Sequence, residues 1–123
     1  MTEVIKSLAD ISDRYDALFV DLWGCVHNGI KAFSSANESL KKYRYQGGKV
    51  VLVTNSPRPR SGVEKQLTKF GVDFEAWDFI ATSGDSARMA MFRGVVEVKY
   101  ILLVHHLKKI SLSPLMLLMI QLI

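Results

Sequence analysis

This sequence of 123 residues has few of the features that indicate a disulfide-linked, secreted or nucleic-acid-binding protein. A single cysteine, Cys25, excludes an internal disulfide framework and is typical of a reducing compartment, so we expect a cytoplasmic protein. The opening segment MTEVIKSLADISDRYD lacks the apolar run of a secretory signal peptide. The net charge is +4, but the basic residues form no stripe with interleaved aromatic residues, so we expect no nucleic-acid partner.

The chain changes character near residue 94. No aspartate follows Asp85, and 19 of the 29 residues from 95 to 123 are apolar. We therefore predict that residues 1–94 form the partial core of a larger fold and that residues 95–123 form an atypical apolar tail. Codons that can encode VKYILLVHH are also compatible with a shift of reading frame between Gly94 and Val98, so the tail is a candidate out-of-frame segment.

The tail has the hydrophobicity of a membrane segment but not its length. Its last apolar stretch, Leu115 to Ile123, is far shorter than the roughly 20 residues that a membrane-spanning helix needs. Pro114 interrupts any helix that would join this stretch to the apolar residues before it. We therefore do not expect a membrane partner, and a small membrane-associated protein remains the third of our hypotheses.

Strand and helix patterns alternate along residues 1–94. Continuous apolar runs predict strands buried on both faces, and apolar residues at helical spacing predict the helices between them. We expect strands within residues 17–23, 49–55 and 77–83, and helices within residues 3–15, 34–48, 59–71 and 84–94. We expect a serine to cap the helix that begins at residue 34. This order predicts an α/β fold with a doubly wound, Rossmann-like, three-layer parallel sheet and right-handed crossovers.

Polar residues follow each of the three predicted strands. They are Asp21, Thr54, Asn55 and Ser83. Ligands bind at the carboxyl ends of the strands in sheets of this kind. An aspartate there can attack phosphorus or bind Mg²⁺, and hydroxyl and backbone N–H groups can bind phosphate oxygens. The alternative for each residue is a structural role, in which it caps a loop or a helix.

Three segments, taken together, resemble the haloacid dehalogenase superfamily. They are ALFVDLWGCVHNG, VVLVTNSPRP and ATSGDSAR, within residues 14–94. They are most similar to the branch of capped sugar-phosphate and nitrophenyl-phosphate phosphatases, in a bacterial subgroup of hydrolases. The resemblance implies the core of such an enzyme without its cap domain.

The resemblance also assigns roles to individual residues. It makes Asp21 the nucleophile and a Mg²⁺ ligand, and it makes the backbone carbonyl of Trp23 a second ligand. The phosphate of the substrate would be bound by Thr54, Asn55 and Ser83. Trp23 stands where the family has a second aspartate that serves as general acid and base. The family's lysine and its later acidic metal motif have no counterpart in this sequence, so we expect the Mg²⁺ cofactor of the family to bind weakly or not at all here.

We therefore expect a truncated relative of these hydrolases. Its ancestral activity would be Mg²⁺-dependent hydrolysis of a phosphomonoester, a small phosphorylated metabolite, through an aspartyl-phosphate at Asp21. We expect this chain itself to be inactive or very weakly active. The alternative is a non-catalytic module that binds phosphate or another molecule.

Other residues that bear chemical groups are less informative. His27 is a candidate replacement acid, although a loop histidine more often caps backbone groups. Cys25 is more often a packing residue than a second nucleophile. His105 and His106 are adjacent, so their side chains diverge, and we expect no metal site there.

An exposed strand edge is a further expectation from the resemblance. The family fold places the strand that ends at Asp21 in the centre of the sheet, so residues 17–22 would form an open edge without a later strand. This segment has no lysine or proline to prevent pairing with other chains. We expect either the tail segment VKYILLV to cover the edge or copies of the chain to self-associate through it.

Overall fold

The computed structural model of the chain describes residues 4–95. The described residues divide into two units after residue 89. The first unit contains the three strands and the candidate site. Apart from Val95, the predicted apolar tail lies outside the described residues, and so do the proposed frame shift and the segment VKYILLV.

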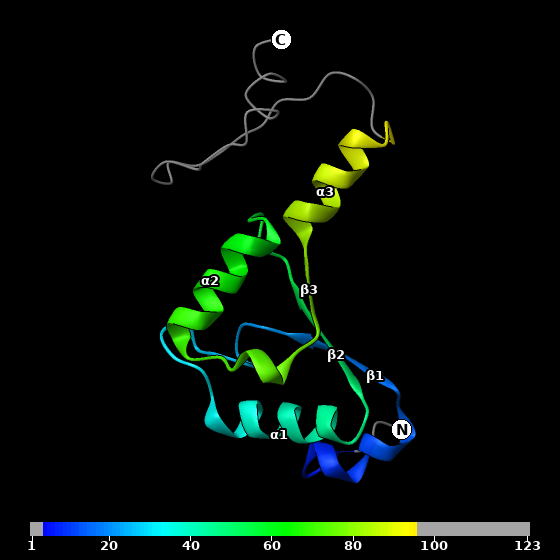
Figure 1. Cartoon of the computed structure of the whole chain (residues 1–123), viewed down its shortest axis with the longest axis vertical. Helices are drawn as coiled ribbons and strands as arrows, with labels where there is room; N and C mark the ends of the chain where they lie inside the picture. The colour runs from blue at the N-terminus through cyan, green and yellow to red at the C-terminus, as the bar shows by residue number, and fades with distance from the viewer. Residues whose placement is uncertain (1–3, 96–123) are drawn as a thin grey trace. The chain divides into compact units, whose positions relative to one another are not determined.

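The strands and helices predicted between residues 17 and 94 are confirmed, with small changes at their ends (Figure 1). In chain order the elements are the 3₁₀ helices η1 (Leu8–Asp10) and η2 (Ser12–Arg14), strand β1 (Ala17–Asp21), helix α1 (Ser34–Tyr45), strand β2 (Lys49–Thr54), helix α2 (Arg60–Phe70), 3₁₀ helix η3 (Phe74–Ala76), strand β3 (Phe79–Thr82) and helix α3 (Ser83–Phe92).

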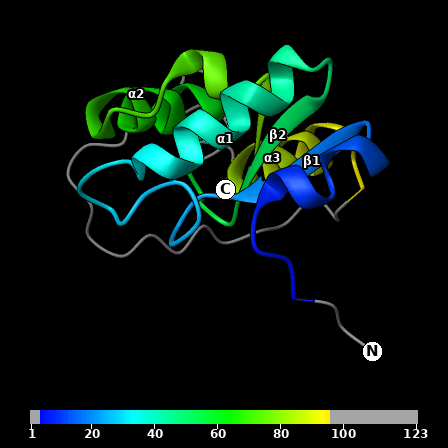
Figure 2. The same ribbon diagram turned by 90° about the horizontal axis from the view of Figure 1, so that it is seen from below.

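The three strands form a parallel sheet in the order β1-β2-β3. Because each crossover between parallel strands is right-handed and the order runs in one direction, α1 and α2 must cover the same face of the sheet. Figure 2 shows these two helices on one side of the strands. The sheet and its helices confirm the predicted α/β, Rossmann-like fold class.

The core lies between this face and the two helices. Alternate strand residues point into it because successive side chains of a strand point to opposite faces. Val50 and Leu52 of β2 are fully buried, and they pack in one cluster with residues of both helices, including Leu40 and Leu67. Complete burial of such a side chain contributes about 2 kcal/mol, so this cluster fixes β2 and hence the position of Thr54 at its end.

The opposite face of the sheet is open in the part of the chain that the structure describes. Phe19 aligns with Val51, and Val51 aligns with Phe79, so these three residues form one row across the strands. Phe19 is 78% exposed and Phe79 is 58% exposed. The prediction that β1 is buried on both faces is therefore wrong for the described residues, because both crossover helices lie on the other face.

Two local predictions are also wrong. The N-terminal segment forms η1 and η2 in place of one α-helix, because the carboxylate of Asp10 accepts the N–H groups of Lys6 and Ser7 and closes a tight turn. No serine caps α1, since Phe33 occupies the cap position and Ser34 is the first helical residue. The N–H of Phe33 donates to the carbonyl of Val26 and the N–H of Ala32 to the distant carbonyl of Phe70, and these two bonds set where the helix begins.

Candidate functional site

The predicted site residues lie at one edge of the sheet. Asp21 is the last residue of β1, and Thr54 is the last residue of β2. Asp21 aligns with Val53, and Thr54 aligns with Thr82, the residue before Ser83. The parallel register therefore brings the carboxyl ends of the three strands together, as the sequence predicts.

The side chain of Asp21 is available to a ligand. The residue is exposed. Among residues 4–95, no hydrogen bond or ion pair engages its carboxylate, in contrast to the carboxylates of Asp78 and Asp85. A carboxylate that stabilises no local structure at the end of a strand can act as a nucleophile or a cation ligand.

Thr54 has both a structural role and a free donor. Its Oγ1 accepts the N–H of Ser56 at 3.2 Å, which closes a turn directly after the strand. A hydroxyl that accepts one hydrogen bond still has a proton to donate. Thr54 is half-buried and the next residue, Asn55, is exposed. Capping of the loop and binding of a phosphate oxygen are therefore compatible at Thr54.

Ser83 lies next to Thr54 but faces its backbone. The Oγ of Ser83 lies 3.5 Å from the carbonyl oxygen of Thr54, a long and weak hydrogen bond. Ser83 is exposed, so it remains accessible from solvent at this edge. The contact connects the end of β2 with the start of α3.

Trp23 packs on its own loop. Gly29 has a φ of +84°, and a Cβ atom at this position would lie 2.2 Å from the indole ring of Trp23. The ring also meets His27 edge-on, with 6.0 Å between the ring centroids, and Trp23 remains 69% exposed. The positive φ favours glycine at residue 29, and a larger residue there would also displace the indole.

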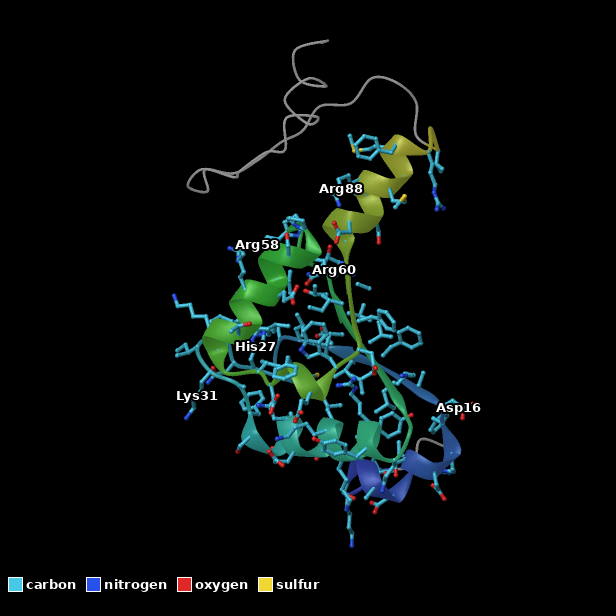
Figure 3. The ribbon with its side chains drawn as sticks, viewed as in Figure 1. Asp16, His27, Lys31, Arg58, Arg60 and Arg88 are labelled. Carbon is cyan, nitrogen blue, oxygen red and sulfur yellow. The ribbon has the colours of Figure 1, made fainter. Side chains whose placement is uncertain are left out.

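His27 is buried and caps a backbone group. Its Nδ1 accepts the N–H of Gly29 at 3.0 Å, and its ring packs against Phe70 with 4.9 Å between the centroids. Burial lowers the pKa of His27, and the negative charge of Asp21 opposes this effect. The capping alternative for His27 is confirmed, because its Nδ1 accepts the N–H of Gly29. Figure 3 shows its position between the sheet and α2.

Cys25 does not pack in the core. It is an exposed, free cysteine, so the expectation that it is a packing residue is wrong. The bridge between Trp23 and His27 and the buried side chain of Val26 hold the loop from Trp23 to Gly29 together. The thiol of Cys25 is left exposed to solvent. His105 and His106 lie outside the described residues.

Two further features lie near this edge of the sheet. Arg58 and Arg60 follow Thr54 in the chain and are exposed, and Arg58 donates to Gln66 (Figure 3). The repeated arginine in PRPR was their signal. Asp85 accepts the backbone N–H of Arg60 across 25 residues, a contact that no local pattern reveals.

The oxygen donors that the resemblance assigns to Mg²⁺ are chemically suitable. Within the described part of the chain, neither the Asp21 carboxylate nor the Trp23 carbonyl accepts a hydrogen bond. No cluster of three or more histidine, cysteine or acidic side chains is present there to hold a metal. Mg²⁺ commonly binds through one or two carboxylates together with phosphate oxygens and water, so these two donors fit an ion that a bound phosphate completes.

No helix among the described residues is both long and apolar enough to pass through a bilayer.

Comparisons with known proteins agree with the fold. The family of haloacid dehalogenase-like hydrolases matches residues 18–106. The crystal structure of a hydrolase of the haloacid dehalogenase-like family from Brucella suis 1330 is 45% identical in sequence, with a TM-score of 0.68 over 72% of this chain. The match covers 34% of that protein, so this chain spans about a third of its length. A comparison with curated proteins found no match. The chain belongs to the haloacid dehalogenase-like hydrolase family.

Proposed function

We propose that this chain binds the phosphoryl group of a small phosphorylated metabolite at the carboxyl edge of its sheet. The observation that carries the proposal is the register of β1 and β2, which sets the uncommitted carboxylate of Asp21 beside the strand that ends at Thr54. Family membership supports the same site, because the match to this family spans residues 18–106 and both positions lie within it.

The chemistry that this arrangement supports is phosphate ester hydrolysis through Asp21. A carboxylate oxygen of Asp21 attacks phosphorus, the ester P–O bond breaks, and its electron pair leaves with the alcohol oxygen. The hydroxyl of Thr54 and the backbone N–H of Asn55 hold the phosphoryl oxygens during transfer. Water then cleaves the aspartyl-phosphate, which restores Asp21 and releases phosphate. Mg²⁺ held by Asp21 and the Trp23 carbonyl would neutralise charge on the phosphoryl group.

Trp23 limits catalysis by this chain after a phosphate ester has bound. The departing alcohol oxygen needs a proton, and an indole cannot supply one from the position of the family's second aspartate. General acid or base catalysis typically contributes about 10²–10⁴-fold to the rate. We therefore propose that turnover by this chain is absent or very slow, and that it acts as a phosphate-binding module.

We also propose a cytoplasmic location, because the exposed thiol of Cys25 persists in a reducing compartment.

Phosphate titration of the ¹⁵N-labelled chain tests the binding site. We expect millimolar inorganic phosphate to shift the amide resonances of Asn55 and Ser56, and Thr54→Val to weaken this response by about fivefold through loss of one hydroxyl donor. Thr68→Val is the matched control, because the hydroxyl of Thr68 bonds to Glu64 within α2. The proposal is wrong if the wild-type resonances at residues 54–56 do not move.

A further inference from the structure

Three successive residues hold the loop that presents Thr54 and Asn55. Ser83, Gly84 and Asp85 (the 83–85 segment) each contact a different point of residues 54–60 (the 54–60 loop). Ser83 contacts the carbonyl of Thr54, and the N–H of Gly84 donates to the carbonyl of Ser56 at 3.1 Å. Oδ2 of Asp85 accepts the N–H of Arg60 at 2.8 Å. The 83–85 segment therefore contacts the loop at its beginning, its middle and its end.

Gly84 allows the two segments to approach closely. A Cβ atom at this position would lie 2.1 Å from the carbonyl oxygen of Pro57 and 2.9 Å from that of Arg58. Both neighbours are backbone atoms, which cannot move aside as a flexible side chain can. The close contact thus depends on glycine, although residue 84 lies in α3, where glycine is otherwise unfavourable.

Asp85 caps a helix that has no cap of its own. Pro59 occupies the cap position of α2 and provides no side-chain acceptor. The carboxylate of Asp85 replaces it, and its negative charge also suits the positive end of the α2 dipole. Oδ1 of Asp85 accepts from Arg88 at 3.1 Å, which fixes the orientation of the carboxylate.

We propose that Asp85 is a positioning residue of the phosphate site, which acts through the 54–60 loop and does not itself contact the ligand. This inference rests on the proposed phosphate-binding function. With its carboxylate on the N–H of Arg60, and with Gly84 against Pro57, Asp85 holds the turn after β2 in the conformation that aims Thr54 and Asn55 at the phosphoryl group. Preorganised binding groups lose affinity when their support is removed.

Two variants and one matched control separate positioning from general stabilisation. Asp85→Ala removes the acceptor, whereas Asp85→Asn keeps an oxygen that can accept the same N–H. Asp73→Ala is the control, because Asp73 also accepts a helix-start N–H, that of Glu75, and also pairs with a cation, Lys41. Asp73 precedes η3 and makes no contact with the 54–60 loop among the bonds of the described residues.

The experiment uses the full chain and two measurements. The first is amide hydrogen exchange without ligand, in which Asp85→Ala is expected to accelerate exchange at Arg60, with recovery in Asp85→Asn. The second is titration with inorganic phosphate, followed by the resonances of Asn55 and Ser56. We expect Asp85→Ala to raise the apparent Kd about fivefold to tenfold, as the loss of one supporting hydrogen bond predicts, and Asp73→Ala to leave it unchanged.

The possible results distinguish the positioning role of Asp85 from phosphate binding itself. Unchanged exchange at Arg60, or an equal loss of affinity in Asp85→Ala and Asp73→Ala, overturns the positioning role of Asp85 while phosphate binding by the wild type still stands. If the wild-type chain shows no response to phosphate, both the site and the positioning role toward it are wrong, whatever the exchange rates show.

Discussion

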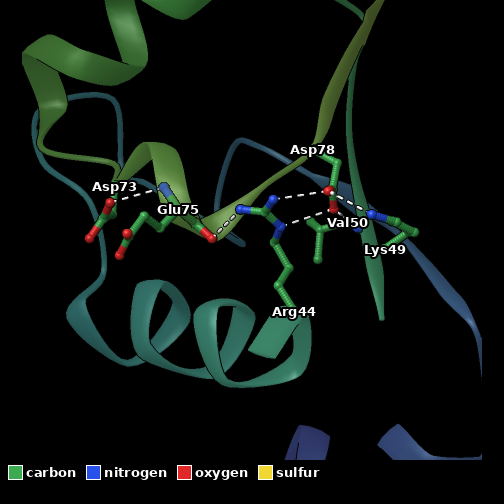
Figure 4. A network of polar contacts seen from close by, with 6 residues as sticks. All are labelled: Arg44, Lys49, Val50, Asp73, Glu75 and Asp78. Carbon is green, nitrogen blue, oxygen red and sulfur yellow. Dashed lines mark hydrogen bonds and ion pairs between the residues drawn. The ribbon is translucent and has the colours of Figure 1, made fainter. Parts of the chain in front are cut away.

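Arg44 and Asp78 form an ion pair through two parallel hydrogen bonds. Nε of Arg44 donates to Oδ2 of Asp78 at 3.0 Å, and Nη2 donates to Oδ1 at 2.9 Å (Figure 4). The same carboxylate accepts the backbone N–H of Val50 at 2.9 Å and an ion pair from Lys49. The guanidinium of Arg44 and the N–H of Val50 lower the pKa of Asp78 to about 2. One carboxylate thus connects α1, the start of β2 and the approach to β3.

The pKa of Asp78 predicts a loss of stability in acid. Because the pKa is lower in the folded state than its ordinary value of 3.8, the stabilisation is complete above about pH 4 and is lost as the pH falls toward 2. The shift corresponds to about 2 kcal/mol. We expect Asp78→Asn to be less stable than wild type at neutral pH, and this difference to shrink by about 2 kcal/mol by pH 2. Urea unfolding at both pH values measures it.

The control for this experiment is Asp13→Asn, since Asp13 is exposed and forms no ion pair among the described residues. A stability difference for Asp78→Asn that stays constant between pH 7 and pH 2 would show that the ion pair does not form.

Opposite effects are expected for two Gly→Ala substitutions in helices. Gly84→Ala places a methyl group 2.1 Å from the carbonyl oxygen of Pro57, so the backbone must move, at a cost of about 1–3 kcal/mol. Gly62→Ala in α2 meets no atom closer than 3.7 Å and should stabilise the chain by up to about 1 kcal/mol. Thermal unfolding of both variants measures the two changes in stability. Equal changes would show that the contact of Gly84 with Pro57 is not tight.

Catalysis by this chain is expected to be at background. With Trp23 in place of a proton donor, p-nitrophenyl phosphate and Mg²⁺ should give no turnover above that of Asp21→Asn. Trp23→Asp restores a carboxylate but loses the indole that packs on Gly29, so we expect lower stability in that variant. Measurable wild-type turnover that disappears in Asp21→Asn would contradict the expected inactivity and would confirm the nucleophile.

Self-association between two copies of the chain is expected through β1. Among the described residues β1 pairs with β2 alone, so its outer edge has free N–H and C=O groups beside the apolar row of Phe19, Val51 and Phe79. We expect light scattering to show association of the wild-type chain and a shift toward monomer in Phe19→Lys, which adds charge to an already exposed position. Ile30→Lys is the control, because Ile30 is 80% exposed but lies in a loop. A wild-type chain that stays monomeric would refute the expectation.

Local patterns in the sequence were sufficient to predict the strands and the positions of Asp21 and Thr54. Apolar runs predict strands, and a polar residue after such a run falls at the carboxyl end whatever packs around it. The same patterns could not predict that Phe19 is exposed, since they do not show which face the helices cover. The start of α1 at Ser34 and the contact from Asp85 to α2 depend on residues distant in the chain, so no local pattern indicates them.

The order of the strands has a consequence for how the chain folds. In the described sheet β2 pairs with β1 and β3 pairs with β2, so each new strand adds next to the strand that precedes it in the sequence. Within the described sheet no strand pairs with one further along the chain than the next, although the aligned residues Ala17 and Lys49 are 32 positions apart and such non-local parallel pairing is slow. The sheet can therefore assemble from β1 onward while the ribosome is still extending the chain.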